Sequence, residues 1–291
     1  MDVKPFNTIA PNISISHQFK NKQRLKLNYS HRIERPDYSD MNPFIDASDP
    51  KNLTTGNPNL KPERGNKIEL GFGGTSKSGV SYSSTLFYRG NLDDIQPYTR
   101  YYSTYTIGDS VYTNVAVRMR ENIGREDNYG LSFFTSIPVK EKFNLRVNIS
   151  LFQRYIITGI SSIADVHGFN YRANMNTSYQ LSKTFILEFF ANFNSPRINA
   201  QGTMPSWSSY NFAFRKQLFH KNGSIALTAT NFFNEYVDQK TNLVGDNFTL
   251  VNVRRVPFRS FGINFTYKFG KMEFRRDKEP EELNQGGGGG G

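Results

Sequence analysis

The segment Arg259-Ser-Phe-Gly-Ile-Asn-Phe-Thr-Tyr-Lys-Phe269 decides the class of fold. Every second residue from Phe261 to Phe269 is bulky and apolar, and the residues between them are small or polar. A repeat of two residues predicts a β-strand with one apolar face and one polar face. Such a strand fits a soluble sandwich, where the apolar face packs on a second sheet. It also fits a membrane barrel, where the apolar face contacts lipid.

The composition narrows the possible functions. The 291 residues include no cysteine, which excludes disulfides, thiolate nucleophiles and cysteine metal sites. The formal net charge is +11, but lysines and arginines alternate with apolar residues along strands, so we do not expect a nucleic-acid partner. No segment approaches the ~18 apolar residues of a spanning helix, whereas a spanning strand needs only ~9–11 residues. The aromatic content of 14% suits the two aromatic girdles of such a barrel.

The same alternation recurs along the chain, and we count about eleven strands without convincing helical periodicity. A long extended segment covers 105–138. The alternating positions lie within 13–19, 24–30, 68–72, 82–88, 129–137, 143–151, 171–181, 185–193, 210–214, 225–229 and 259–269.

The predicted connections alternate in length, as in outer-membrane barrels and unlike most soluble sandwiches. Tight turns fall near 20–23, 76–79, 139–142, 182–184 and 220–223, and long connections near 37–64, 100–108, 157–167, 195–208 and 234–248. The sequence therefore predicts an all-β fold, an antiparallel transmembrane β-barrel portion. An odd strand count leaves unpaired edges, and the first residues do not read as an export signal, so we expect an incomplete barrel over 1–270. Residues 271–291 are charged and end in six glycines, which predicts a disordered tail.

Four segments resemble TonB-dependent outer-membrane receptors. Gly56-Asn-Pro-Asn-Leu-Lys-Pro-Glu63 resembles the family's loop motif that leads into a barrel strand, and 29–44 resembles the segment before it. Residues 227–234 resemble the penultimate strand. The last strand resembles the aromatic signal that the barrel-assembly machinery reads. The matching positions are Gly56, Asn57, Pro58, Leu60, Lys61, Pro62 and Glu63 in the loop motif, and Gly262, Phe265, Tyr267 and Phe269 in the insertion signal.

The resemblance covers roughly 8–270 and implies the C-terminal half of a barrel of about 22 strands, without the plug domain. It implies a bacterial outer-membrane importer of a scarce solute such as an iron chelate, vitamin, glycan or peptide. The implied partners are outer-membrane lipid, the plug and the other barrel half, the barrel-assembly machinery, and the TonB energy complex acting through the plug. The alternative is a structural outer-membrane barrel, an adhesin or assembly element without energised transport. A soluble lectin-like module is the least favoured reading.

Several polar residues are candidates for a channel wall. They are Arg24, Lys26, Arg146, Arg172, Asn174 and Glu188. Their cations could attract anionic solutes, but pairing with Glu69, Glu188 or plug residues is favoured because buried charges need partners.

We expect no catalytic, cofactor-binding or metal-binding residue. Glu188 has no second carboxylate or histidine beside it, so the sequence does not predict an enzyme. Asp37, Asp40, Asp46 and Asp49 could gather around Ca²⁺, but their spacing fits no known calcium loop, and solvated acids are the favoured reading.

Overall fold

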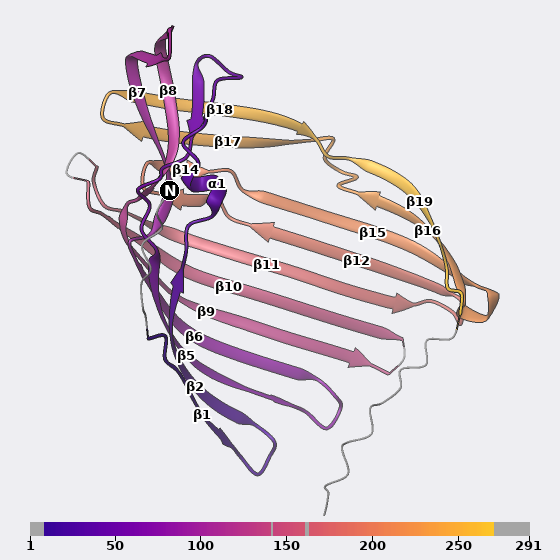
Figure 1. The fold of residues 1–291 in the computed structure, drawn as a ribbon. Helices are drawn as coiled ribbons and strands as arrows, with labels where there is room; N and C mark the ends of the chain where they lie inside the picture. Colours follow the sequence, from indigo (N-terminus) through magenta and orange to yellow (C-terminus); the bar gives the residue numbers. More distant parts are fainter. Residues whose placement is uncertain (1–8, 141, 161–162, 271–291) are drawn as a thin grey trace, which may run out of the picture.

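The fold is built on one antiparallel sheet of eleven strands that curves like part of a cylinder wall (Figure 1). The computed structural model describes residues 9–140, 142–160 and 163–270, so the predicted tail lies outside it. In spatial order the strands are β1 (Asn12–Gln18), β2 (Arg24–Glu34), β5 (Glu63–Thr75), β6 (Ser81–Leu92), β9 (Gly124–Val139), β10 (Phe143–Thr158), β11 (Val166–Gln180), β12 (Phe185–Asn194), β15 (Trp207–Leu218), β16 (Gly223–Thr230) and β19 (Ser260–Tyr267). The all-β prediction and its eleven strands are confirmed.

Two smaller sheets lie at one end of the main sheet (Figure 1). The second sheet contains β3 (Ile45–Asp46), β4 (Asn52–Thr55), β8 (Ser110–Asn122) and β7 (Ile95–Ile107), and the third contains β13 (Arg197–Asn199), β14 (Gly202–Met204), β17 (Tyr236–Gly245) and β18 (Phe248–Pro257). A four-residue helix α1 (Tyr38–Met41) and a 3₁₀ turn η1 (Phe219–Lys221) complete the described elements. Neither helix has the length and apolarity needed to cross a membrane.

All five tight turns lie at the end of the main sheet opposite the smaller sheets (Figure 1). In the β5–β6 turn, the Gly79 amide donates to the Ser76 carbonyl at 3.0 Å, and Gly79 has a φ of +84° that favours glycine. The predicted connection near 100–108 and the single extended segment over 105–138 are wrong. These residues form the β7–β8 hairpin and β9, because Tyr98 and Tyr102 pack into loop cores instead of remaining in a flexible link.

One face of the main sheet is apolar and exposed. Register pairs across neighbouring strands join one residue from each of seven strands into a single row. The row runs Ile15, Leu27, Leu70, Leu86, Leu131, Leu151 and Tyr171. Leu86 in the middle of the row is 56% exposed, so no second layer of the described chain covers this face. A continuous apolar row of exposed and partly exposed side chains is the pattern of a surface that contacts lipid.

Aromatic side chains lie on both sides of the aliphatic row. Toward the smaller sheets, the ring centroids of Tyr88 and Tyr129 are 4.9 Å apart, and those of Tyr129 and Tyr155 are 6.1 Å apart. Toward the tight turns, the rings of Phe219 and Tyr267 are 5.5 Å apart. Two aromatic girdles around an apolar band mark the membrane interfaces of a barrel wall. We call the strand portions between these girdles the spanning portion.

The apolar cores lie among the smaller sheets and their connections, and one of them also includes Ile156 at the end of β10. One core contains Tyr98, Ile123, Ile156 and Ala200, and partly buried isoleucines surround it. The other contains Leu53, Val115 and Val117. We call α1 together with the second and third sheets the cap. Because the cap has its own cores, its loops hold a defined shape above the spanning portion.

The main sheet has two open edges. β1 pairs only with β2, and β19 pairs only with β16, among the described residues. Every residue of β1 and of β19 is exposed. Unpaired backbone groups are costly in hydrocarbon, so a membrane wall of this kind requires further strands at both edges.

Candidate functional site

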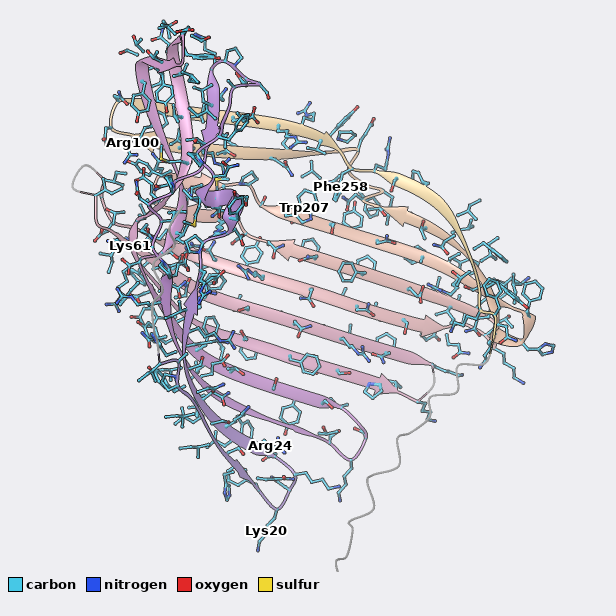
Figure 2. The ribbon with its side chains drawn as sticks, viewed as in Figure 1. Lys20, Arg24, Lys61, Arg100, Trp207 and Phe258 are labelled. Carbon is cyan, nitrogen blue, oxygen red and sulfur yellow. The ribbon has the colours of Figure 1, made fainter. Side chains whose placement is uncertain are left out.

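The polar face of the main sheet carries all six residues that the sequence predicts for a channel wall. On this face a row of small and polar residues runs across the strands in register: Lys26, Gly71, Thr85, Ser132, Ser150 and Arg172. The six predicted residues are Arg24 and Lys26 on β2, Arg146 on β10, Arg172 and Asn174 on β11, and Glu188 on β12. Figure 2 shows Arg24 near the tight-turn end, whereas Lys61 and Arg100 lie toward the cap. That this face lines a channel stays a prediction.

The carboxylates expected to neutralise these cations are paired elsewhere. Glu69 bonds to Lys67 at 2.7 Å, and Glu188 bonds to Arg215 Nη2 at 2.8 Å. Lys67 is two residues from Glu69 on the same face, and Arg215 lies diagonally across from Glu188 on the next strand. The expected pairing with Glu69 or Glu188 is therefore wrong. In the described part of the chain, Arg24, Lys26, Arg146 and Arg172 form no ion pair.

Phenylalanines interrupt the polar face at several positions, and the sequence did not predict the pair Phe87 and Phe152. Phe87 and Phe152 flank Gly130 in register, with ring centroids 6.4 Å apart. A Cβ atom on Gly130 would lie 2.5 Å from Phe87 Cζ, so only glycine fits between the rings. The Arg172 guanidinium carbon lies 5.8 Å from the centre of the Phe152 ring. The available signal was the run Leu86-Phe-Tyr88, where three consecutive bulky residues break the alternation.

The predicted loop motif forms a strap between the spanning portion and the cap. The Gly56 amide donates to the Asn42 carbonyl at 2.9 Å, and a Cβ on Gly56 would lie 2.3 Å from that oxygen. Asn57 donates its backbone amide to the Asp40 carbonyl at 2.7 Å and its side-chain amide to the Arg120 carbonyl at 3.1 Å. The glycine and the asparagine are thus required by close backbone approach and by side-chain pairing with β8.

The second half of the motif fastens the strap to the base of the β7–β8 hairpin. The Asn122 side chain accepts from the Lys61 amide at 2.8 Å and donates to the Lys61 carbonyl at 2.9 Å. Leu60 is 7% exposed, and Glu63 Oε1 accepts from the Ile95 amide at 2.6 Å. Burial raises the pKa of Glu63 to about 7. Pro58 and Pro62 lie in the connection between β4 and β5.

A buried ionic cluster lies where the main sheet meets the cap. Glu126 pairs with Arg154 and, at 3.3 Å, with Arg89, and it also accepts from Asn128 at 2.7 Å. Glu126 and Arg154 are 2% and 3% exposed, so they need each other as partners. Burial also raises the pKa of Asp94 to about 6, and neighbouring Glu126 adds to that rise. This cluster could not be predicted from the sequence, because its members come from three strands, β6, β9 and β10.

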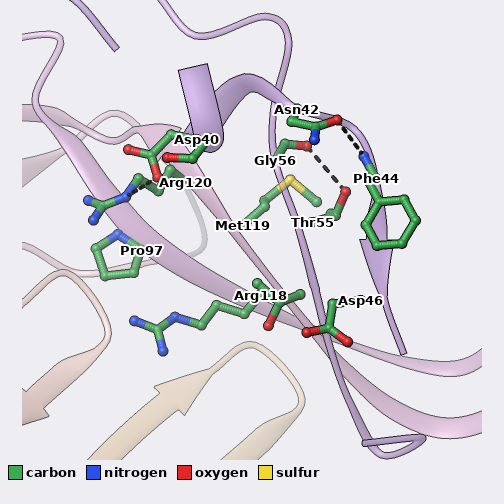
Figure 3. Close-up of a pocket in the computed structure, with 12 residues that line it drawn as sticks. Asp40, Asn42, Phe44, Asp46, Thr55, Gly56, Pro97, Arg118, Met119 and Arg120 are labelled. Atoms are coloured by element: carbon green, nitrogen blue, oxygen red, sulfur yellow. Dashed lines mark hydrogen bonds and ion pairs between the residues drawn. The ribbon is translucent and has the colours of Figure 1, made fainter. Parts of the chain in front are cut away.

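A cavity of about 360 Å³ opens between α1, the β3–β4 segment and β8 (Figure 3). Asp40 and Arg120 face each other across one side, with 2.9 Å between Asp40 Oδ1 and Arg120 Nε. Arg118 and Asp46 lie on the other side, and Phe44 is 74% exposed at the rim. Most of the residues that line the cavity lie in the predicted long connection near 37–64 and on β8.

The loop aspartates do not converge on one point. Asp40 pairs with Arg120, Asp46 Oδ1 accepts from the Ser48 amide at 3.0 Å, and Asp49 Oδ1 accepts from the Lys51 amide at 2.9 Å. Within the described ranges, no group of three or more His, Cys, Asp or Glu side chains is placed to hold a metal ion. These acids shape the loop backbone.

The predicted insertion signal lies on and just after the open edge strand β19. Phe265, Tyr267 and Phe269 are 62%, 44% and 85% exposed, and the rings of Tyr267 and Phe269 are 5.4 Å apart. Gly262 pairs with Thr228 of β16. The bulky residues share one face, where the assembly machinery or lipid can reach them. Their role as a signal stays a prediction.

The comparisons with known proteins agree with this architecture. A family model described as "Outer membrane protein beta-barrel family" matches residues 2–267. No curated protein matches the chain. Among solved structures, the siderophore receptor PirA from Pseudomonas aeruginosa is similar at 13% identity with a TM-score of 0.56. A mutant of the ferric enterobactin receptor PfeA from the same organism gives 17% and 0.59, and the copper transporter OprC gives 10% and 0.57.

These similarities cover only part of each solved protein. Each match spans 89% of this chain, but 40% of PirA, 40% of PfeA and 39% of OprC. The chain therefore covers about two fifths of the length of these proteins. At such low identities the match establishes the fold: the described sheet corresponds to part of a receptor barrel wall.

Proposed function

Because the chain belongs to the outer membrane protein beta-barrel family, we propose that it forms the C-terminal barrel part of a TonB-dependent receptor that imports a scarce solute. The family places the chain in the bacterial outer membrane, and its members are generally receptors and transporters rather than enzymes. Beyond this location and family, we propose that import is driven by TonB, that a scarce solute is carried, and that a plug and the other barrel half complete the protein.

The observation that carries the proposal is the main sheet itself, which has one apolar face, one polar face and two unpaired edge strands. An exposed apolar row on one face suits lipid, and the polar row behind it suits a water-filled or plug-filled interior. The edges β1 and β19 would each pair with a strand from the other half of the barrel. The exposed apolar face is also not expected for a soluble lectin-like module, in which a second sheet would pack on that face.

The cap supports a role in solute capture. Its two cores and the strap at Gly56–Glu63 hold loops in a fixed arrangement around the cavity of Figure 3. Binding residues are commonly placed on loops that a rigid scaffold positions. The transported solute would first contact these loops, then pass along the polar face when the TonB complex displaces the plug.

A growth experiment tests the proposal. A strain that lacks the gene would be grown with a ferric siderophore, cobalamin, a glycan or a peptide as the sole limiting nutrient. We expect a growth defect on one of these nutrients, and the same defect in a strain that lacks TonB. Normal growth on all four nutrients, together with lost adhesion or a weakened envelope, would favour the structural barrel without energised transport.

A further inference from the structure

The cavity of Figure 3 lies on the polar face of the second sheet. Register pairs place four residues side by side on that face: Asp46 opposite Thr54, Thr54 opposite Arg118, and Arg118 opposite Thr99. The row therefore holds the acidic Asp46 on β3 and the basic Arg118 on β8, separated by the neutral Thr54 on β4.

The opposite face of the same sheet is a packed core. Leu53, Val115 and Val117 are 1%, 0% and 0% exposed, and Leu53 pairs with Val117 in register. Side chains of neighbouring residues in a strand point to opposite faces, so this core fixes the direction in which Thr54 and Arg118 project. The polar row is held in place before any ligand arrives, which lowers the entropy cost of binding.

No ion pair with a described residue neutralises the two charges of the row. Asp40 pairs with Arg120 at 2.9 Å, which leaves Arg118 without an acidic partner or hydrogen bond among the described residues. Asp46 accepts from Ser48 through Oδ1 only, so its second oxygen is open to a cation. A guanidinium with free N–H groups matches a carboxylate in two parallel hydrogen bonds, and a free carboxylate oxygen matches an ammonium group.

The spacing of the strands that carry these charges indicates a type of ligand. Neighbouring strands are about 4.8 Å apart, so two spacings separate the backbones at Asp46 and Arg118 by roughly 10 Å. An extended tripeptide has a similar length, at most roughly 3.5 Å for each residue. A cavity of about 360 Å³ is large enough for a small ligand.

We propose that this cavity binds the two free ends of a short peptide, with its carboxylate on Arg118 and its ammonium group on Asp46. Thr54 lies between the two charges and offers a hydroxyl to the central peptide group. Phe44, 74% exposed at the rim, supplies apolar surface for a peptide side chain. The inference rests on the proposed function, because it identifies the solute class for the same loops.

Calorimetric titration of the full-length, detergent-solubilised receptor tests this inference. The probes are Ala-Ala-Ala, its N-acetyl derivative and its C-terminal amide. We expect the free tripeptide to bind and each capped peptide to bind about tenfold more weakly, as expected for loss of one charge-assisted hydrogen-bonded contact. Equal binding of all three peptides, or no binding of any, would overturn the inference.

Matched variants separate the two charges. Arg118→Gln should weaken the free tripeptide about tenfold and leave the C-terminal amide unchanged, and Asp46→Asn should do the same with the N-acetyl peptide. Arg254→Gln on β18 and Asp109→Asn at the β7–β8 turn are exposed controls outside the cavity. Heat-modifiable migration on a gel verifies that each variant is folded. A variant that weakens free and capped peptides equally contradicts the assigned contact.

Binding and uptake can fail separately. The titration needs no energy source, so peptide binding without TonB-dependent growth would overturn the proposed function alone. TonB-dependent uptake of another solute without peptide binding would overturn this inference alone.

Discussion

The side-chain amide of Gln201 forms two hydrogen bonds with the backbone of Thr99, 102 residues away in the sequence. Gln201 Oε1 accepts from the Thr99 amide at 2.8 Å, and Gln201 Nε2 donates to the Thr99 carbonyl at 2.8 Å. The side chain therefore pairs with β7 as a neighbouring strand would. Gln201 is 4% exposed, so water cannot easily replace either bond.

Replacing this amide should loosen the β7–β8 hairpin. Gln201→Ala leaves a buried N–H and a buried C=O of Thr99 unpaired, at a cost of about 1–3 kcal/mol for each group. Hydrogen exchange should show faster exchange along β7 with little change in β10. Gln239→Ala on β17 is the control, because the Gln239 side chain makes no hydrogen bond to a described residue. Equal effects of the two substitutions would argue against the pairing.

Gly56→Ala should displace the strap. The added Cβ would lie 2.3 Å from the Asn42 carbonyl oxygen and 2.7 Å from the Asn42 nitrogen, both backbone atoms that cannot rotate away. We expect a cost of about 1–3 kcal/mol and faster proteolysis within 37–62. Gly71→Ala on β5 is the comparison, because its nearest contact would be an ordinary 3.4 Å from Thr85. An intact proteolysis pattern for Gly56→Ala would contradict this reading.

The anchor at Glu63 should weaken as pH rises. The carboxyl accepts from the Ile95 amide and faces Asn91. Burial raises its pKa most, and the nearby acids Asp94, Glu34 and Glu126 add to that rise. The folded pKa of about 7 lies above the ordinary 4.5, so the folded state holds the proton more tightly than the unfolded chain. The stabilisation is therefore complete below about pH 4.5 and is lost as pH rises to about 7.

Hydrogen exchange of the Ile95 amide, corrected for its intrinsic pH dependence, measures this effect. Local opening should become easier from pH 5 to pH 8, and Glu63→Gln, which keeps the acceptor oxygen, should flatten the profile. Glu188→Gln in the spanning portion should leave the profile unchanged. If exchange of the Ile95 amide in the unaltered protein does not depend on pH after this correction, the prediction is wrong.

Adjacent substitutions on β6 can test which face contacts lipid. Leu86→Arg places a charge in the exposed apolar row and should cost about 2–4 kcal/mol in a bilayer. Thr85→Arg places the same charge on the polar face and should cost much less. Urea titration of the full-length protein in lipid vesicles measures both. Equal costs would mean that the two faces meet the same environment.

The aromatic end of β19 should affect assembly. Replacing Phe265, Tyr267 and Phe269 together with serine removes the exposed bulky positions at this edge and should lower the amount of folded protein in the outer-membrane fraction. Val253→Ser on β18 is the control, because Val253 is also exposed, at 55%, but lies outside the spanning portion. A loss with Val253→Ser as large as with the triple variant would contradict a specific signal.

The main sheet could be predicted because its pattern depends on residues that are neighbours in the sequence. Alternation between neighbours such as Leu86 and Thr85 sets the face of each residue, and strand register then follows from tight turns such as 76–79. The eleven strands were recovered for this reason. Their cap-side ends were underestimated: β10 continues from Leu151 to Thr158, where buried Arg154 and Ile156 replace the simple alternation.

The cap could be predicted only in part. Residues 195–208 and 234–248 read as polar connections, yet they hold β13, β14, β17 and the start of β18. The contacts that order them join distant segments, as between Gln201 and Thr99 or Asn122 and Lys61. Side-chain amides that pair with a remote backbone leave no periodic mark in a sequence. The pairing of Glu126 with Arg154 was invisible for the same reason.

The separate apolar cores of the cap have a consequence for how such receptors diversify. The row through Leu70 and Leu86 and the core around Leu53 and Val117 share no residue, so the two can drift at different rates. Residues of the cavity such as Phe44 and Arg118 could therefore be exchanged without altering the surface that faces lipid. Substitutions in the cap and substitutions in the lipid-facing wall are thereby subject to independent selection.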